Sequence, residues 1–352
     1  MHVALLANLK KNAPQLPGLA PDHWDDLDSE ATIEAIMAAL GSRGHDVTFI
    51  EGNSKLVDGL QKLQSDICFN ICEGHLGDSR ESHVPALLEM LRLPYTGSQV
   101  LTLALTLDKP MTKRVLTYHD LPTPAFQVFE RVNEPLDPQM TFPLFVKPSR
   151  EGTGMGVSSE SIVHNENQLR TQLRHLFQRY DQPVLAEQFI DGREITVGVV
   201  GNLATPVAWR LPEDEEAPRL SRGLHFLPPL EVDMSRYPAE EAGIYTSRIK
   251  TELANEFHYL CPAPLTAEQV EELNWLAAAT FRVTGCLDVA RVDFRLDAHD
   301  NNKPYILEIN PLPGLNPDYS DLCVEAKAEG WTYEALVNRI LDEAVERYGL
   351  GS

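Results

Sequence analysis

The sequence has few of the features that mark secreted, membrane-spanning or zinc-binding proteins. It contains five cysteines in 352 residues, and none of them stands in a Cys-x-x-Cys pair, so neither a disulfide framework nor a zinc site is expected. No stretch approaches the roughly 18 uncharged apolar residues of a membrane span. The apolar residues at 2–7 run into lysines rather than follow them, unlike a signal peptide. We therefore expect a soluble, cytoplasmic protein with reduced thiols and no membrane partner.

Positive charge is also scarce. The chain has 30 Lys and Arg residues against 52 Asp and Glu residues, a formal net charge of -22. Proteins that bind nucleic acid rely on clustered basic side chains, so a nucleic-acid partner is excluded. An anionic ligand must instead meet a local basic pocket. The lysines that stand inside apolar, glycine-rich segments are therefore the first candidates for function.

The chain begins with the pattern of a parallel sheet. An apolar strand at 2–7, a helix over 28–40 and a second strand at 47–51 predict a strand-helix-strand unit with a right-handed crossover. The connection at 12–27 is longer than such loops usually are. Two interpretations stay open for it, a substrate loop or a surface insertion.

The rest of the chain alternates short strands with helices, which predicts an α/β (α+β) protein of two or three sub-domains at this length. Residues 212–243 are rich in proline and acidic residues and are expected to form a mobile excursion. The remaining predicted elements are a strand at 66–72, helices over 83–91, 101–119, 168–180, 266–283 and 331–348, an extended segment at 121–129, and a hairpin of strands at 287–297 and 304–310.

A glycine-rich segment at 142–158 carries the strongest local signal. An apolar strand delivers Lys147, and a loop with Gly152, Gly154 and Gly156 follows before the chain is expected to return to strand. Glycines at every second position let backbone N–H groups wrap around phosphate oxygens, and a lysine at a strand end adds a fixed positive charge. The segment therefore indicates a phosphate site, although an ordinary glycine-rich hairpin has the same pattern.

The hairpin at 287–310 places three oxygen-bearing side chains within reach of one another. Glu308 and Asn310 share one face of their strand, and the paired strand can bring Asp293 opposite them. Such ligands suit Mg²⁺, which prefers a few carboxylates together with nucleotide phosphates. A solvated sheet face is the alternative, but Glu308 stands in a strand too apolar to place a carboxylate casually.

A third segment, 183–201, offers groups for a nucleotide base. Glu187 stands at a strand end and is followed by Gln188 and Ile190, whose backbone groups could meet an adenine edge. Glu194 could accept ribose hydroxyls. Any edge strand offers similar groups, so this segment is informative only together with the other two.

In their order along the chain, these segments resemble the D-alanine–D-alanine ligases, a branch of the ATP-grasp family. The resemblance rests on the blocks LPYTGS, LALTLDKPMTKRVL, VKPSREGTGMGVS, EQFIDGREITV, YLCPA, RVDF and LEINPLPGL. It implies an ATP-grasp fold with three parts. These are a Rossmann-like N-terminal substrate domain at 1–100, a central ATP-binding subdomain at 101–190 and a C-terminal subdomain at 191–352 that carries the metal and oxyanion sites.

The resemblance also implies roles for individual residues. Lys109 and Lys147 would hold the ATP phosphates beneath the loop of Gly152, Thr153 and Gly154, and Glu187, Gln188, Ile190 and Glu194 would hold adenine and ribose. Asp293, Glu308 and Asn310 would bind two Mg²⁺ ions, with Mn²⁺ as a possible substitute, and Lys250 would reach the transferred phosphate. Arg291 and the Gly314 backbone N–H would form an oxyanion hole, and Ser320 would meet the carboxylate of the amine substrate.

Departures from the family pattern fall on the groups that touch the amino acids. The family's two-serine loop reads Thr153 and Gly154 here, and the tyrosine beside the loop lysine is replaced by Thr251. Glu73 stands where the family has a histidine before glycine. Candidates for contact with the substrate are Glu73, Arg80 and, for its ammonium group, Asp25, Asp28 or Glu30.

The sequence thus predicts an ATP-dependent carboxylate–amine ligase of the acid–D-amino-acid class, which joins two small amino acids through an acyl phosphate. One alternative is a ligase for L-amino acids, for amino acids other than alanine, or for a specialised amine acceptor. A second alternative is a non-catalytic nucleotide-binding module of the same fold. The expected partners are small-molecule amino acids, and the resemblance suggests a homodimer.

Overall fold

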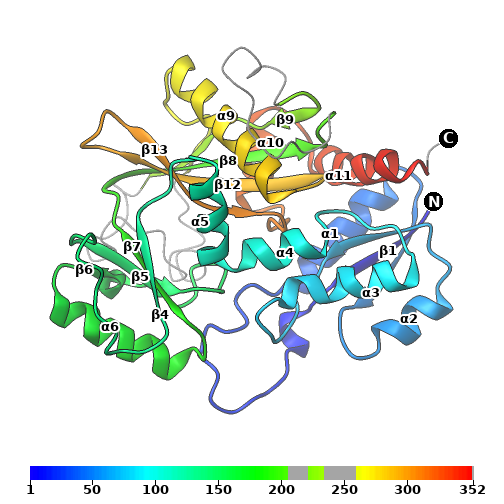
Figure 1. The fold of residues 1–352 in the computed structure, drawn as a ribbon. Coiled ribbons are helices and arrows are strands. Elements are labelled where there is room, and N and C mark those ends of the chain that lie inside the picture. Colours follow the sequence, from blue (N-terminus) through cyan, green and yellow to red (C-terminus); the bar gives the residue numbers. More distant parts are fainter. Residues whose placement is uncertain (205–220, 234–258, 351–352) are drawn as a thin grey trace.

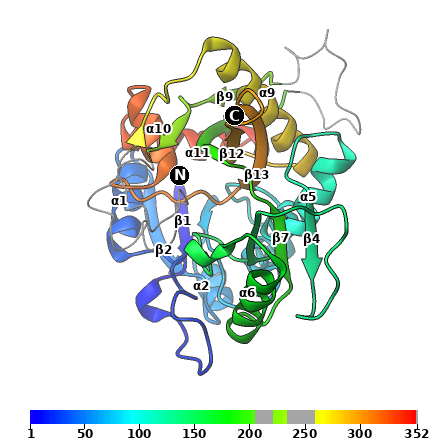
Figure 2. The ribbon, with the colours of Figure 1, turned by 90° about the vertical axis from the view of Figure 1, so that its left-hand side faces the viewer.

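Three β-sheets with helices packed on their faces organise the part of the chain that the structure describes (Figure 1). This structure is a computed structural model, and it describes residues 1–204, 221–233 and 259–350. In Figure 2 the N-terminal helices and the green second sheet lie on different sides of the molecule, beneath β12 and β13 of the third sheet. None of the helices in the described ranges is long and apolar enough to cross a membrane.

The first sheet is the parallel unit that the sequence predicts. Successive side chains of its strand β1 (His2–Ala7) point to opposite faces of the sheet. Val3 and Leu5 therefore face one hydrophobic cluster, whereas Ala4 and Leu6 face another. Helix α1 contributes to the first cluster and helices α2 and α3 to the second. The elements are β1 (His2–Ala7), η1 (Lys10–Asn12), α1 (Glu30–Gly41), β2 (Asp46–Glu51), α2 (Leu56–Lys62), β3 (Ile67–Ile71), η2 (Arg80–Ser82) and α3 (His83–Leu91), with strand order β2-β1-β3.

The C-terminal end of the chain returns to this first sheet. Helices α10 (Asp321–Ala328) and α11 (Tyr333–Tyr348) bury Leu322, Ile340 and their neighbours in the same cluster as β1 and α1. The side chain of Asn338 donates to the carbonyl of Ala39 at 2.8 Å, across 299 residues of sequence. One core therefore joins both ends of the chain.

The second sheet is antiparallel and is covered by one long helix. Leu169, Leu173 and Leu176 of α6 lie at helical spacing and pack against Val146 and Ala186 of the sheet. The elements are β4 (Phe126–Phe129), β5 (Leu144–Pro148), η3 (Ser159–Ser161), β6 (Ile162–Val163), α6 (Glu166–Arg179) and β7 (Val184–Gln188), in the order β4-β7-β5-β6.

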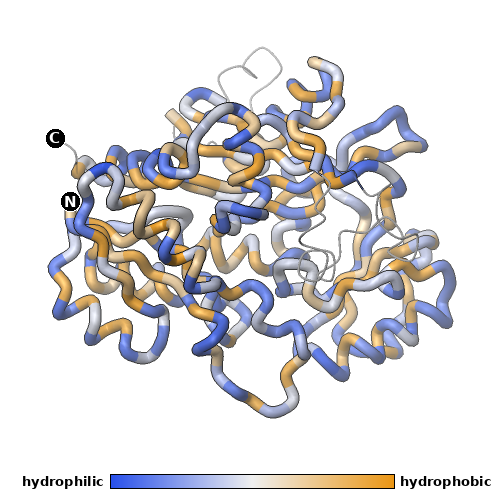
Figure 3. The backbone as a smooth tube through the Cα atoms, turned by 180° about the vertical axis from the view of Figure 1, so that it is seen from behind, coloured by the Kyte–Doolittle hydropathy of each residue, from blue (hydrophilic) through white to orange (hydrophobic). Residues whose placement is uncertain are grey.

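The third sheet has one apolar face and one polar face. Val292 and Phe294 of β12 pack against α9, whereas Arg291, Asp293 and Arg295 point to the opposite side. Hydrophobic stretches correspondingly lie in the interior strands in Figure 3. The elements are β8 (Gly192–Gly201), β9 (Leu224–Phe226), β10 (Leu230–Val232), β11 (Tyr259–Leu260), α9 (Ala267–Thr284), β12 (Val289–Asp297) and β13 (Lys303–Asn310), in the order β11-β10-β8-β12-β13 with β9 beside β8.

The helix predicted over 101–119 is two helices, α4 (Val100–Leu107) and α5 (Lys109–Tyr118). Pro110 has no N–H to donate to the preceding turn, so a continuous helix is disfavoured there. Asp108 instead caps α5 and accepts a hydrogen bond from the backbone N–H of Met111 at 3.0 Å. The break places Lys109 at the first position of α5.

Two further predictions need correction. The glycine-rich loop does not return to strand at once, because Thr153, Gly154 and Gly156 adopt positive φ angles of 52°, 74° and 71° and the chain turns before η3 and β6. Residues 212–243 are not wholly irregular, since they include β9 and β10. The parts at 212–220 and 234–243 lie outside the described residues.

Asp288 connects the first sheet region, the third sheet and the last helix. Its carboxylate is fully buried and accepts hydrogen bonds from the backbone N–H of Gly97 at 2.8 Å and from Asn202 Nδ2 at 2.8 Å. Arg347 of α11 donates to both carboxylate oxygens, at 3.0 and 2.7 Å. The charge is therefore paired and its other lone pairs are satisfied, as burial of a carboxylate requires.

We predict that the substitution Asp288→Ala lowers the free energy of unfolding by about 3 kcal/mol, because it removes the carboxylate partner of the part-buried Arg347 and leaves the Gly97 N–H and Asn202 without their acceptor. Chemical denaturation measures the change. Asp120→Ala is the matched control, since Asp120 is exposed and has a similar φ of 56° against 63° for Asp288. If both variants lost the same free energy of unfolding, the positive φ at the substituted position would explain the loss. That result would contradict the ion-pair explanation.

Candidate functional site

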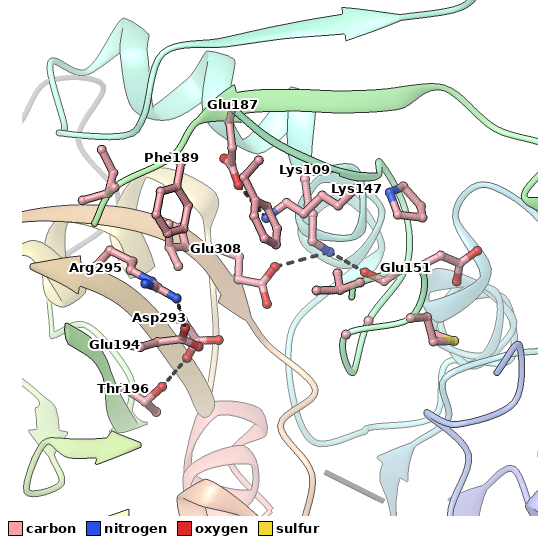
Figure 4. Close-up of a pocket in the computed structure, with 18 of the residues that line it drawn as sticks. Lys109, Lys147, Glu151, Glu187, Phe189, Glu194, Thr196, Asp293, Arg295 and Glu308 are labelled. Atoms are coloured by element: carbon pink, nitrogen blue, oxygen red, sulfur yellow. Dashed lines mark hydrogen bonds and ion pairs between the residues drawn. The ribbon is translucent and has the colours of Figure 1, made fainter. Parts of the chain in front are cut away.

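Two adjoining cavities lie on the polar face of the third sheet. The first, about 110 Å³, opens between this sheet and the second sheet, and Figure 4 shows the side chains that line it. The second, about 200 Å³, lies between β13, the segment after it and the loop that precedes α1. The residues that line both cavities are Lys109, Gly152, Arg291, Glu308 and Asp321.

Asp293 stands at the centre of the polar face. It accepts hydrogen bonds from Thr196 at 2.6 Å, from Arg291 at 2.9 Å to each oxygen, and from Asn310 at 3.0 Å. Glu308 lies directly opposite Asp293 in the pairing of β12 with β13. The pairing of β12 with β13 has a register shift between Asp293 and Phe294. Such bulges change the direction of a strand and are common beside functional sites.

The donor set of Asp293, Glu308 and Asn310 fits a hard divalent cation. Two carboxylates and one amide oxygen from adjacent strands leave positions for water and phosphate oxygens, which is the coordination that Mg²⁺ prefers. Within residues 1–204, 221–233 and 259–350, no cluster of three or more His, Cys, Asp or Glu side chains has the arrangement of a metal site. An all-protein cage of the zinc or calcium kind is therefore not present in this part of the chain.

A buried ion cluster fixes Lys147 at the inner wall of the first cavity. Glu187 accepts from Lys147 at 2.8 Å and forms an ion pair with Lys113 at 2.7 Å. Burial alone would raise the pKa of Glu187, but the two ammonium groups outweigh it and hold the pKa below its usual value. The pKa of Lys147 is raised despite burial because Glu187 and Glu308 stabilise its charge. Lys147 is thus a charged, oriented group.

Lys109 stands between the two cavities. Its Nζ donates to the backbone carbonyl of Glu151 at 2.5 Å and pairs with Glu308 at 3.3 Å. Figure 4 shows both contacts, and it also shows Lys147 of β5. The start of α5 and the glycine-rich loop together determine where this charge lies.

The outer part of the first cavity is apolar and fits a flat ring. Phe145 and Phe189 have ring centroids 6.5 Å apart with an interplanar angle of 26°, and Ile190 also lines the cavity. Arg295 lies over the Phe189 ring and pairs with Glu194 at 3.1 Å. The side chain of Gln188 contacts Thr141 and the carbonyl of Pro143. A ligand would therefore be contacted by the backbone groups of Gln188 rather than by its side chain.

Arg291 stands between two carboxylates at the junction of the cavities. Besides the bidentate pair with Asp293, it contacts Asp321 at 3.3 Å. Burial would lower the pKa of Arg291, but Asp293 and Asp321 raise it well above its usual value. The guanidinium is therefore a permanent positive charge where both cavities meet.

Gly314 and Ser320 lie together on the wall of the second cavity. A Cβ atom on Gly314 would stand 2.9 Å from Ser320 Oγ, which explains why a residue without a side chain is needed here. Ser320 Oγ accepts a hydrogen bond from the backbone N–H of Asn316 at 2.9 Å. Its hydroxyl hydrogen can therefore point to a ligand in the cavity.

Part of the lining of the second cavity, here called the acidic wall, consists of Asp28, Glu73 and Glu81. Burial raises the pKa of Asp28 and of Glu81 to about 7 and raises that of Glu73 well above its usual range. Among the residues that the structure describes, these three side chains have no hydrogen-bond or ion-pair partner. Asp25 and Asp26 are paired, with Lys10 and Arg80 respectively. The wall thus offers three carboxyl groups that are unpaired in the described part of the chain, and a cationic ligand would favour their ionised form.

Some predicted site residues lie elsewhere. Glu30 is exposed, pairs with Lys11 and lines neither cavity, and Arg80 is buried behind the acidic wall. Lys250 and Thr251 lie outside the described residues. Thr153 lines the second cavity, and the predicted nucleotide groups Gly152, Gly154, Glu187, Gln188 and Glu194 line the first.

The sequence analysis missed four residues of the site, which are Lys113, Thr196, Arg295 and Asp321. The alternation that selected Arg291 and Asp293 extends to Arg295, and Lys113 lies one helical turn after Lys109, so both carried a local signal. Thr196 and Asp321 gave none, because their neighbours are set by strand pairing and by the return of the chain to the first sheet. Glu81 follows Arg80 in the segment already singled out.

Comparisons with known proteins agree with the geometry. A family model described as D-ala D-ala ligase C-terminus matches residues 115–213 and 230–342. An uncharacterized protein, y4sG, of Sinorhizobium fredii is 34% identical over 90% of this chain and 88% of its own length. A D-alanine–D-alanine ligase of Syntrophotalea carbinolica is 34% identical over 94% of this chain and 95% of its own length.

The fold is also similar to that of a solved structure. A D-alanine–D-alanine ligase from Bacillus anthracis, solved in complex with ATP, aligns over 100% of both chains with a TM-score of 0.71 and 23% sequence identity. At that identity the likeness concerns the fold alone. It matches the mixed arrangement of one parallel and two antiparallel sheets in this chain.

The acidic wall leads to a prediction about stability and pH. Glu81 has a pKa of about 7 in the folded protein against an ordinary value of 4.5, so between these values the folded state holds a proton that the unfolded chain releases. Stability therefore falls as the pH rises through this window. The variant Glu81→Gln cannot ionise, and we expect it to gain on the order of 2 kcal/mol over the natural protein between pH 5 and pH 8.

Urea denaturation at pH 5 and pH 8 measures this gain. The control is Glu34→Gln, which changes an exposed glutamate on α1 and is expected to alter both curves equally. A stability difference for Glu81→Gln that stays constant between the two pH values would contradict the assignment of a raised pKa.

Proposed function

Since this chain belongs to the D-alanine–D-alanine ligase family, we propose that it joins two amino acids in an ATP-dependent reaction through an acyl phosphate. The observation that carries the proposal is the shared wall of the two cavities. A ligase must bring a terminal phosphate and a carboxylate together, and the groups suited to this chemistry, Lys109, Arg291 and Glu308, stand where the cavities meet.

ATP fits the first cavity in one direction. The apolar outer part, with Phe145 and Phe189, suits adenine, and Glu194 suits the ribose hydroxyls. The phosphates then lie toward Lys147 and Lys109, beneath the backbone of the glycine-rich loop. This orientation directs the terminal phosphate to the junction.

Mg²⁺ would be held by Asp293, Glu308 and Asn310. The family resemblance implies two such ions, and Mn²⁺ has similar ligand preferences. When bound, the metal offsets the negative charge of the phosphates during transfer. Without it, Asn310 and Arg291 already hold the Asp293 carboxylate in position. The protein therefore keeps the ligand oxygens oriented from two paired strands.

The residues at the junction favour transfer by position and charge. Lys109 and Lys147 would stabilise the negative charge of the phosphoryl group as the carboxylate of the first amino acid attacks the terminal phosphorus and ADP leaves with the electron pair of the broken P–O bond. The neutral amine of the second amino acid then attacks the acyl phosphate, phosphate leaves with the electron pair of the broken C–O bond, and the amine nitrogen gives up one proton. Arg291, together with the backbone N–H of Gly314, would stabilise the oxyanion of this second step.

The second cavity provides for both ends of an amino acid. Ser320 and Arg291 line this cavity and would meet a carboxylate, and Asp28 of the acidic wall would meet an ammonium group. Asp25 also lines this cavity, but Lys10 already neutralises it at 2.8 Å. Of the three acidic candidates before and at the start of α1, Asp28 is therefore the one we assign to the substrate.

The acidic wall also favours a second candidate substrate class. Alanine brings one ammonium group, whereas Asp28, Glu73 and Glu81 present three carboxyl groups with raised pKa values to the cavity. A second cationic group on the amino acid would stabilise the ionised form of a further carboxyl group and pair with it. Diamino acids therefore belong in any substrate panel beside D-alanine and its L-isomer.

Release of ADP tests the proposal. Purified protein with ATP and Mg²⁺ is incubated with a panel of D- and L-amino acids that includes diamino acids, and we expect ADP formation that depends on the amino acid. ATP binding without any amino-acid-dependent turnover would refute the ligase and support a non-catalytic nucleotide-binding module. The variant Glu308→Gln is the control for the site, and we expect its kcat to fall on the order of a hundredfold.

Substrate binding distinguishes Asp28 from Glu30. We predict that Asp28→Asn raises the KM of the amino acid about tenfold, because a buried charge partner of the ammonium is lost, a change of roughly 1.4 kcal/mol. Glu30→Gln, which alters an exposed residue paired with Lys11, should change that KM less than twofold. Steady-state kinetics at saturating ATP measures both values, and the reverse order would assign the ammonium to Glu30.

A further inference from the structure

Arg80 lines neither cavity, yet it joins three segments that border them. Its side chain is 7% exposed. It donates to the backbone carbonyl of Arg150 at 2.9 Å, to Asp26 at 3.1 Å and to Glu151 at 3.2 Å. The side chains of Asp26 and Glu151 are 6% and 5% exposed. This buried bridge links the first domain, the loop before α1 and the start of the glycine-rich loop.

The bridge continues to the junction of the cavities. Glu151, which Arg80 holds by its side chain, accepts from Lys109 through its backbone carbonyl at 2.5 Å. Gln182 donates to the other oxygen of the Glu151 carboxylate at 2.6 Å. Lys109 in turn pairs with Glu308 at 3.3 Å. The position of a phosphate-binding lysine thus depends on a residue that Arg80 fixes.

A second contact holds the far end of the same glycine-rich loop. Asp22 accepts from the backbone N–H of Gly156 at 2.9 Å and from the Tyr180 hydroxyl at 2.6 Å. Figure 1 shows the dark-blue segment after β1 crossing from the first sheet toward the green subdomain. The loop at 12–27 therefore reaches the glycine-rich loop at both ends, through Asp26 and Arg80 at one and through Asp22 at the other.

The glycine-rich loop needs such external contacts. Three of its residues have positive φ, and the backbone hydrogen bonds within it are the two turns closed by Met155 to Gly152 and by Val157 to Gly154. A planar guanidinium can meet three acceptors at fixed angles, which a lysine ammonium on a flexible stem does not reproduce. A buried ion pair is by itself weak support for stability, so the geometry points to placement of the loop.

We propose that Arg80 is a positioning residue for the nucleotide: through Glu151 and Arg150 it sets the place of the glycine-rich loop and of Lys109 relative to the acidic wall. This inference rests on the proposed function, because it takes the first cavity to bind ATP. It explains why Arg80, predicted as a substrate residue, lies behind the cavity wall and contacts the phosphate loop instead.

Binding of ADP alone tests the proposal without the need for an amino acid. Isothermal titration with ADP and Mg²⁺ is carried out on the full chain with Arg80→Met, Arg80→Lys and Glu151→Gln, and an unfolding curve for each confirms that it is folded. We expect a Kd about tenfold higher for Arg80→Met and an intermediate value for Arg80→Lys. The control is Arg131→Met, which alters an arginine whose side chain is 83% exposed and paired with a glutamate.

Kinetics supply a readout that loss of stability alone would not move. We expect the KM of ATP to rise about tenfold in Arg80→Met while the KM of the amino acid changes less than threefold. If Arg80→Met does not fold, Arg80→Lys and Glu151→Gln, which preserve the size of the side chain, decide the question. Folded variants that bind ADP with the natural Kd would overturn the proposal. If the natural protein binds ADP but forms no ADP from ATP with any amino acid, the proposed ligase activity is refuted. The ADP affinities of the variants still test the role of Arg80 in that case.

Discussion

The pairing of β12 with β13 is the interaction on which the whole site depends. It places Asp293 opposite Glu308, brings Asn310 beside them and leaves Arg291 between Asp293 and Asp321. The register is well defined because β12 pairs with β8 on one side and with β13 on the other, so backbone hydrogen bonds hold Arg291 and Asp293 from both sides. A shift of one residue in this register would turn Asp293 or Glu308 into the apolar core beneath α9.

The sequence was sufficient where local periodicity carries the information. Alternation along 287–297 and 304–310 identified Arg291, Asp293 and Glu308 as residues of one face, and the hairpin between them is confirmed. The strand-helix-strand opening and the likeness to D-alanine–D-alanine ligases are confirmed too. Arg80 could be selected as a candidate but its partners could not, because Asp26 and Glu151 lie 54 and 71 residues away in the sequence. Such contacts follow from the packing of domains and leave no local pattern.

The acidic chain concentrates its useful cations at one place. Four cations lie within the site, and each is paired with a carboxylate from another element: Lys109, Lys113, Lys147 and Arg291. These pairs keep the cations charged and oriented inside the protein, where the lower dielectric strengthens their field. A net charge of -22 is therefore compatible with an anionic ligand, because these cations stand together at one place.

The shared core of the two chain ends has a consequence for biosynthesis. Helix α11 and its neighbour α10 cover the face of the first sheet that also packs against α1. A ribosome releases β1, α1 and β3 long before these helices are made, so the nascent sheet emerges with one hydrophobic face incompletely covered. The hydrophobic core around the first sheet is therefore completed only after α10 and α11 have been made, and until then the growing chain exposes a surface of the kind that chaperones bind.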